Sequence, residues 1–285
     1  MSEIFVVAET LPEAWENAVL ECWNKGTQKK TEYDKSEDPP SRDCAALIVI
    51  KNPLAEPRIH RCFPGGLEDL YTYKEEVVYG VHDHWIDPDA GKWSYTYSQR
   101  LTKYPANGIE YVLNKKDYLD IPQLAIMTLK LKEAPHSRRA QAITWVPIVD
   151  QRDIHPPCLQ RVWCTVVDDK LDMHIHIRSN DAYKAGFMNM YAFIALQEHI
   201  AMILSHEIER EIGVGVYRHF ADSWHIYGSY FEEFEGFRKT VLERKFEERV
   251  WSSDDPIVLG AFEDAQEKLF KENKEAAEKL AKENK

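Results

Sequence analysis

Hydrophobic and polar positions in the first half of the chain repeat with two different periods. Apolar residues three and four positions apart predict helices over residues 13–22 and 67–81. Residues 45–51 (AALIVIK) are a short aliphatic run, which predicts a buried strand. Residues 27–42 are polar and predict a loop, whereas residues 121–131 fit a helix or a strand. The first half is therefore expected to mix helices with strands.

The pattern is sharper in the second half, where several strands and one long helix are predicted. The predicted elements are strands over residues 140–149, 159–167 and 171–178, a polar turn at 168–170, a helix over 187–206 and a strand leading into 224–227. In the strand over 171–178 every second residue is apolar, so one of its faces should be buried. Two strands joined by a short polar turn predict a β-hairpin.

A change of composition marks the end of the predicted globular part. Residues 263–285 are mostly Ala, Glu and Lys, which predicts a charged tail exposed to solvent, either as a helix or as a frayed end. Residues 1–262 contain no internal repeat and no clear linker, so we expect one domain that is long enough to bury a core. Strands that alternate with long helices agree with an α/β fold, but this pattern alone does not specify the topology.

The net charge argues against two classes of partner. The chain has 36 Lys and Arg against 48 Asp and Glu, which gives −12 at pH 7. General binders of nucleic acid or of membrane surfaces need a dominant positive field, so we expect neither partner. A small ligand that carries a phosphate is compatible with this charge, because a few arginines can hold one phosphate locally.

The cysteines and histidines show no pattern of a disulfide framework or of a metal site. Five cysteines are spread along the chain without a CxxC pair. His174 and His176 share a strand face, and residues 82–87 read HDHWID, but no further ligand completes either set, so we predict no metal. The first residues carry acids where a signal peptide would be basic, and no run has the length of a membrane span, so we expect a cytoplasmic protein.

The predicted hairpin brings a cysteine close to an arginine. If the turn is centred near Asp169, Cys158 lies opposite about residue 180, beside the segment Arg178-Ser179-Asn180-Asp181. An arginine beside a thiol stabilises the thiolate, which is how a cysteine becomes a nucleophile near neutral pH. The alternative is that Cys158 is only a small buried residue.

The surroundings of Cys158 resemble the signature of thymidylate synthases and the related pyrimidine nucleotide hydroxymethylases. In that family a Pro-Cys nucleophile precedes an Arg-Ser-x-Asp element by the interval that separates Cys158 from Arg178, which is 20 residues (178 minus 158). Further elements follow in the family's order over residues 138–227: the pair Arg138-Arg139, Trp145, Asn189 eight residues after Asp181, and His225-Ile226-Tyr227. In the first half only Glu76 and Tyr97 resemble family residues.

The resemblance implies a role for each matched residue. Cys158 would add to C6 of a uracil ring and form a covalent intermediate, because this makes C5 nucleophilic enough to take a one-carbon unit. The implied ligands are Arg178 and Ser179 for the 5′-phosphate, Arg138 and Arg139 for the same phosphate from the partner subunit, Asp181 and Asn189 for the base, and His225 and Tyr227 for the sugar 3′-hydroxyl. Glu76 and Tyr97 would manage proton movement at O4 and C5.

The activity implied by the resemblance is the methylation of dUMP to dTMP with 5,10-methylenetetrahydrofolate. The pyrimidine nucleoside monophosphate would be bound by a homodimer with shared active sites. The implied fold is a twisted mixed sheet with helices on one face, whose other face packs against the partner's sheet. Asn189 favours uracil, because an amide both donates and accepts hydrogen bonds; alternatively, Asn189 only caps the helix that follows it.

Two other functions are considered beside methylation. The charged sequence AAEKLAKENK at the C-terminus differs from the short apolar tail that covers folate in the family, and water that reaches the intermediate would give a hydroxymethyl product. The first alternative is therefore a dUMP, dCMP or ribonucleotide 5-hydroxymethylase that uses the same folate. The second is a nucleotide-binding protein that keeps the fold without catalysis.

Overall fold

The computed structural model describes residues 2–105 and 120–283. Across these residues one mixed sheet of eight strands has the order β1-β3-β9-β7-β6-β5, with β2 paired to β3 and β8 paired to β9. Its strands are β1 (Ser2–Ala8), β2 (Thr27–Lys29), β3 (Ser41–Ile50), β5 (Gln141–Ile143), β6 (Leu159–Val167), β7 (Lys170–Ile177), β8 (Asn180–Asp181) and β9 (Gly213–Ile226). A second pairing joins β4 (Ile59–His60) to β10 (Val250–Trp251).

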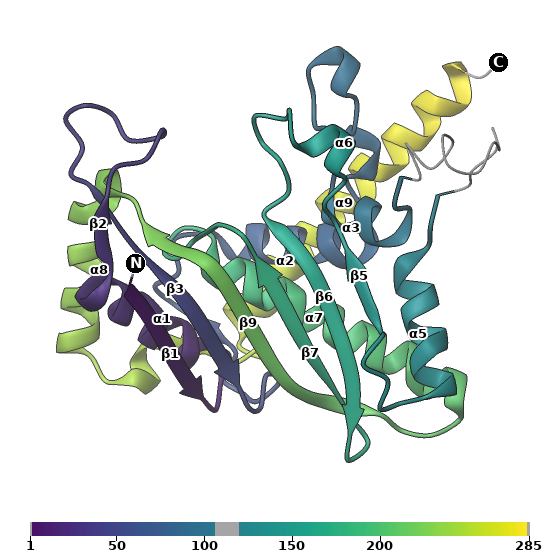
Figure 1. Cartoon of the computed structure of the whole chain (residues 1–285), viewed down its shortest axis with the longest axis horizontal. Coiled ribbons are helices and arrows are strands. Elements are labelled where there is room, and N and C mark those ends of the chain that lie inside the picture. The colour runs from purple at the N-terminus through teal and green to yellow at the C-terminus, as the bar shows by residue number, and fades with distance from the viewer. Residues whose placement is uncertain (1, 106–119, 284–285) are drawn as a thin grey trace.

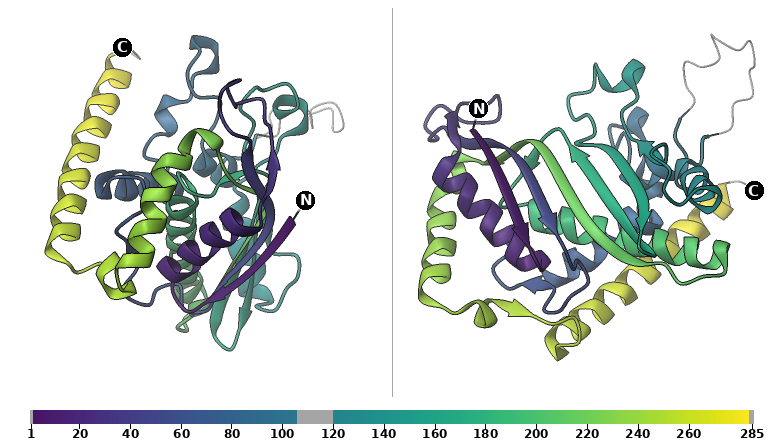
Figure 2. Two further views of the ribbon diagram at one scale, coloured as in Figure 1. Left: turned by 90° about the vertical axis from the view of Figure 1, so that its left-hand side faces the viewer. Right: turned by 60° about the horizontal axis from the view of Figure 1, so that its bottom comes forward.

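Most of the helices lie on one face of the sheet, as the left view in Figure 2 shows. The α-helices of the described residues are α1 (Leu11–Lys25), α2 (Leu67–Tyr79), α3 (Tyr97–Thr102), α5 (Gln123–Glu133), α6 (Pro147–Asp150), α7 (Gly186–Ile208), α8 (Phe231–Glu243) and α9 (Pro256–Glu283). Figure 1 shows the opposite face of the sheet uncovered, and on β1 the side chains of Phe5 and Val7 are 67% and 45% exposed. The predicted α/β class and the mixed sheet with helices on one face are confirmed.

The β6–β7 hairpin forms as predicted, but its register differs. Leu171, Met173, Ile175 and Ile177 are all fully buried, so the predicted alternation is confirmed. Asp168 and Asp169 form a two-residue turn with φ values of 50° and 56°, and a bulge lies between Leu159 and Arg161. The turn is therefore centred between the two aspartates rather than on Asp169, which shifts the pairing by one residue. The bulge shifts it by one more, so that Cys158 lies opposite Arg178 rather than residue 180.

Several element boundaries also differ from the sequence prediction. The strand predicted over 140–149 is confined to β5, because Pro147 opens α6 and the carboxylate of Asp150 accepts from the Val146 amide. Residues 27–42 contain β2 and the start of β3, and the strand before residue 227 extends back to Gly213. Residues 121–131 prove to be helical, as α5.

The predicted tail is helical, but its first part is packed against the domain. α9 begins at Pro256, so the expected boundary at residue 262 lies inside a continuous helix. Ala265 and Leu269 are buried, and the ring of Phe262 lies 5.3 Å from that of Tyr71 on α2. The prediction that the whole segment 263–285 is exposed to solvent is therefore wrong at Ala265 and Leu269. Apolar residues on one face of α9 contact α2.

The most apolar helix is the central helix of the core. The expectation that no run has the length of a membrane span is wrong for α7, which is long and apolar enough to cross a membrane by length and composition; 61% of its most apolar window is, however, buried inside the fold. It packs beside the sheet together with α1, whose Trp15 indole donates to the Ala182 carbonyl (2.9 Å). The residues before α7 are thus attached to the core.

A buried histidine holds the short strand β8 against β9. His219 is fully buried on β9, with ring nitrogens 2.9 Å from the Tyr217 hydroxyl and 3.0 Å from Oδ1 of Asn180. Burial lowers the pKa of His219 from 6.5 to about 3. The ring is therefore neutral in the folded protein near neutral pH, and it holds the segment that follows Arg178.

This neutral histidine should make stability depend on pH. The unfolded chain binds a proton on His219 below its ordinary pKa of 6.5 and the folded chain does not, so stability is lost as pH falls from about 6.5 towards about 3. The variant H219Q should reduce the slope of unfolding free energy against pH by up to about 1.4 kcal/mol per pH unit. Urea unfolding at several pH values measures the slope, with H206Q as the control for removing an exposed histidine. An equal slope in wild type and H219Q would contradict this account.

Candidate active site

A pocket of about 600 Å³ lies at one end of the sheet. The start of β6, the ends of β7 and β9, and the start of β3 meet there, because β7 and β9 are parallel to each other, β6 runs antiparallel to β7, and β3 runs antiparallel to β9. Five of the residues predicted from the sequence line it: Cys158, Arg178, Ser179, His225 and Tyr227. The fold thus brings together side chains that are far apart in sequence.

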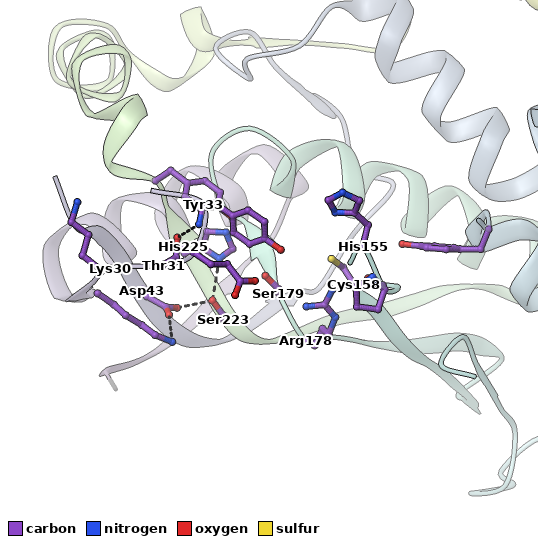
Figure 3. Close-up of a pocket in the computed structure, with 15 residues that line it drawn as sticks. Lys30, Thr31, Tyr33, Asp43, His155, Cys158, Arg178, Ser179, Ser223 and His225 are labelled. Carbon is purple, nitrogen blue, oxygen red and sulfur yellow. Dashed lines mark hydrogen bonds and ion pairs between the residues drawn. The ribbon is translucent and has the colours of Figure 1, made fainter. Parts of the chain in front are cut away.

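Arg178 is fixed to the loop that carries the cysteine. Its backbone amide donates to the Cys158 carbonyl (2.9 Å), and its guanidinium donates to the carbonyls of Pro156 (2.7 Å) and Pro157 (3.0 Å). Figure 3 shows the sulfur of Cys158 and the guanidinium of Arg178 as neighbours on one side of the pocket, with His155 above them. The two prolines and the arginine therefore set the place of the thiol.

Burial and the arginine have opposite effects on the thiol. Burial is the larger effect and raises the pKa of Cys158, while the charge of Arg178 lowers it. The stabilisation of the thiolate by arginine that we expected from sequence is present, but it does not outweigh desolvation. In the free protein the half-buried sulfur is therefore a thiol near neutral pH.

The opposite side of the pocket holds a chain of hydrogen bonds. The hydroxyl of Ser223 donates to Oδ1 of Asp43 (2.8 Å) and lies 3.0 Å from Nδ1 of His225. Figure 3 shows these three side chains across the pocket from Cys158, with Ser179 between the two groups. The ring of Tyr227 lies 4.7 Å from that of His225 in an edge arrangement. The His-x-Tyr element is thus anchored to β3.

Asn189 lies in the first turn of α7 and does not cap it. The cap position is occupied by Ala185, whose carbonyl accepts from the Asn189 amide (2.9 Å), so the helix-cap interpretation of Asn189 is wrong. Oδ1 of Asn189 accepts from the hydroxyl of Tyr73 on α2 (2.6 Å). Burial raises the pKa of Tyr73 well above 10, so this hydroxyl stays protonated and donates.

Glu76, Tyr97 and Asp181 are not among the residues that line the pocket. The hydroxyl of Tyr97 accepts from the amide of Leu159 (3.3 Å), next to Cys158, and Oε2 of Glu76 lies 3.2 Å from Nδ1 of His82. Oδ1 of Asp181 accepts from the amides of Tyr183 (3.1 Å) and Lys184 (2.8 Å), in the turn that leads into α7. Burial raises the pKa of Asp181 to about 6.

Arg138 and Arg139 are exposed and do not line the pocket of their own chain. They precede β5, where Gln141 pairs with Trp163 and Ile143 with Arg161. Because β5 and β6 are antiparallel, the arginines lie beyond the end of β5 that points away from Cys158. The structure therefore separates them from the residues of the signature within one chain.

Several pocket residues were missed by the sequence analysis. Lys29, Lys30 and Tyr33 come from the segment predicted to be a plain loop, and Tyr95 and His155 lie beside the cysteine. The only available signal was for Tyr95, which stands two residues before Tyr97 in WSYTYSQRL. The lysines carry no motif, and they reach the pocket only because β2 pairs with β3.

The histidine pairs considered as metal ligands have other contacts. His176 lies 3.0 Å from Asp222, and His174 lies 3.2 Å from Arg218. His82 is stacked on Trp85 with ring centroids 3.7 Å apart. Among residues 2–105 and 120–283, no group of three or more His, Cys, Asp or Glu is arranged to hold a metal ion.

Three comparisons with known proteins agree with one another. A family model described as thymidylate synthase matches residues 68–254. A protein of Methanocaldococcus jannaschii described as "Putative thymidylate synthase" is 33% identical over 186 residues, which cover 64% of this chain and 72% of that protein. One of Methanosarcina acetivorans with the same description is 30% identical over 196 residues, covering 68% and 78%. The thermostable thymidylate synthase A of Bacillus subtilis is similar in fold, with a TM-score of 0.59 at 18% identity over 81% of this chain and 84% of that one.

The electrostatic balance at Cys158 can be tested by alkylation. In a C62S background, R178M should shift the alkylation of Cys158 by iodoacetamide to higher pH, because the charge of Arg178 lowers the pKa of this thiol. Cys22, Cys44 and Cys164 are fully buried and should not react. R178K keeps a positive charge, so its alkylation midpoint should lie between those of the parent protein and R178M. This variant separates the effect of charge from that of the lost loop contacts. An unchanged or lower pH midpoint of alkylation in R178M would refute the claim that Arg178 lowers the pKa of Cys158.

Proposed function

This chain belongs to the thymidylate synthase family, and we propose that it converts dUMP to dTMP with 5,10-methylenetetrahydrofolate. The observation that carries the proposal is the position of the Cys158 sulfur beside Arg178 in a pocket whose far side holds His225 and Tyr227. A nucleoside monophosphate has a phosphate, a sugar hydroxyl and a ring that this arrangement can contact together.

Cys158 is the nucleophile in this proposal. Its thiolate adds to C6 of uracil, the C5–C6 double bond opens towards O4, and C5 becomes able to attack a carbon electrophile. At the end C5 loses its proton and the sulfur leaves C6, which restores the ring and frees the thiolate. Burial makes this thiolate costly in the free protein, so its charge is supported by Arg178.

Asn189 favours uracil over cytosine. Because Oδ1 already accepts from the Tyr73 hydroxyl, the amide NH2 group is left to donate. Uracil has a carbonyl at C4 that accepts this hydrogen bond. Cytosine has an amino group there, which is itself a donor and cannot accept a hydrogen bond from the Asn189 amide. Tyr73 is therefore a second residue that we assign to base recognition, with Glu76 one helical turn further along α2.

The phosphate would be held by Arg178 and Ser179, with Lys29 and Lys30 as further cations of the pocket. We propose that Arg138 and Arg139 complete this site in the partner subunit of a homodimer, because in their own chain they lie away from it. The uncovered face of the sheet supports this arrangement, since Phe5 and Val7 expose apolar side chains there. Asp181 would act on the ring through its neighbours in the turn before α7.

A second pocket of about 650 Å³ shares Tyr95 and His155 with the first, and we propose it as the site of the flat folate ring. Trp93 and Ile154, which line it, are 40% and 79% exposed and offer an aromatic and an apolar surface in this second pocket. When bound, the folate supplies the one-carbon unit and the hydride. The chain's own contribution is to stack on this ring and to keep water from the reacting carbon, while Tyr97 holds a proton at the loop that carries Cys158.

The course of α9 supports a second candidate, a pyrimidine nucleotide 5-hydroxymethylase. The described part of α9 packs on α2, with an ion pair between Lys268 and Glu68, and contributes no residue to the lining of either pocket. A helix that lies away from both pockets does not shield the intermediate from water, and water would then take the place of hydride. A nucleotide-binding protein without catalysis is the third possibility, against which the well-placed Cys158 argues.

The nucleophile is tested by release of tritium from C5-labelled dUMP in the presence of folate. C158A should reduce the rate by at least about a thousandfold, while C62A, which changes another half-buried cysteine, should retain it. Mass spectrometry of the nucleotide distinguishes the two enzymes: the gain of a methyl group supports the proposal, and the gain of a hydroxymethyl group supports the second candidate. Nucleotide binding without tritium release in wild type would overturn both.

Shared active sites are tested by mixing two inactive variants. In a heterodimer of C158A with the double variant R138A/R139A, one of the two sites combines an intact cysteine with intact arginines. After unfolding and refolding of an equal mixture, activity should return to about one quarter of wild type, because half of the dimers are mixed and half of their sites are complete. Continued inactivity of the refolded mixture, with wild type refolding normally, would rule out arginines contributed by the partner.

A further inference from the structure

A buried carboxylate lies behind the sugar side of the pocket and is not part of the family signature found in the sequence. Asp43 is 3% exposed on β3, where it pairs directly with His225 of β9. Its Oδ1 accepts the hydroxyl hydrogen of Ser223 at 2.8 Å, and its Oδ2 lies 3.6 Å from the ammonium of Lys29. The lysine supports a negative charge on this carboxylate.

The hydrogen bond to Asp43 decides which nitrogen of His225 carries the proton. A serine hydroxyl has one hydrogen, so after donating to Asp43 its oxygen presents only lone pairs to Nδ1 of His225, 3.0 Å away. Nδ1 must therefore be the donor in this contact. Burial lowers the pKa of His225, so near neutral pH the ring has a single proton and Nε2 keeps its lone pair.

We infer that Asp43, acting through Ser223, sets the tautomer of His225 so that Nε2 accepts a hydrogen bond from a hydroxyl of the bound ligand. The inference rests on the proposed function for the identity of that group, the 3′-hydroxyl of the nucleotide. Asp43 and Ser223 are positioning residues for this recognition, and His225 makes the contact. The site then requires a donor at the 3′ position and rejects nucleotides in which that oxygen is missing or blocked, as by a second phosphate.

Other arrangements of these three side chains would not give this selectivity. If Asp43 were replaced by a group that donates to Ser223, the hydroxyl would turn towards Nδ1, and the proton of His225 would move to Nε2. Nε2 would then donate rather than accept, and a sugar hydroxyl could meet it only through its lone pairs. The substitution D43N creates this situation while it keeps the size of the side chain.

The tautomer itself is tested by nitrogen NMR of the histidine side chains in the free protein, with H225Q used to assign the signals. Wild type should show His225 protonated on Nδ1, and D43N should show it protonated on Nε2. D34N removes a nearby carboxylate that contacts Ser41 rather than Ser223, and it should keep the wild-type tautomer. A proton on Nε2 in wild type, or the same tautomer in wild type and D43N, would overturn the inference.

The recognition is tested by calorimetric titration with dUMP and with its 3′-deoxy analogue. Wild type should bind the analogue about tenfold more weakly, the effect of one lost hydrogen bond, and D43N should bind the two ligands within about twofold of each other. S223A should lose the discrimination as well, and it serves if D43N fails to fold. D34N should retain it.

The proposed function and the inference about Asp43 can be refuted separately. If dUMP does not bind to wild type, the proposed function is wrong, while the NMR experiment still decides the tautomer. If dUMP binds and turns over but wild type does not distinguish it from the 3′-deoxy analogue, the role of Asp43 is refuted and the proposed function stands. Discrimination that persists in folded D43N and S223A would refute the inference as well.

Discussion

The site depends on how the open end of the β6–β7 hairpin is closed. Arg178 completes the pairing through its amide and binds the carbonyls of Pro156 and Pro157 through its guanidinium, so one residue joins the two strands and holds the loop of Cys158. The charge that a phosphate needs and the position of the sulfur are therefore determined together. A change in the hairpin register would move both.

The same geometry would allow an acidic chain to hold the phosphate of the proposed substrate. The net charge is −12, but the pocket gathers Lys29, Lys30 and Arg178 from elements brought together by the sheet. Burial opposes the ionisation of the Cys158 thiol, which lies beside Arg178, because the charged form loses contact with water. A phosphate group that engages these cations and a ring that closes the pocket would bring substrate and nucleophile together in a site that is held in advance by backbone contacts.

The sequence predicted the parts of the fold and site that depend on local pattern. The alternation of β7, the length of α7 and the approach of Cys158 to Arg178 all follow from spacing. The exact register of the hairpin was not predicted, because its turn uses two aspartates with positive φ in place of glycine or asparagine. Tyr73 and Asp43 could not be found either, since each acts through a contact with a distant element: α2 with α7, and β3 with β9.

The central claim is that the sulfur of Cys158 bonds to C6 of the pyrimidine. A 5-fluorinated dUMP tests it most directly, because fluorine at C5 cannot leave as the proton does, and the covalent intermediate should accumulate in the presence of folate. Mass spectrometry of the digested protein should then find the nucleotide on the peptide that contains Cys158. A nucleotide attached to another residue, or no adduct from a protein that binds the ligand, would contradict the account.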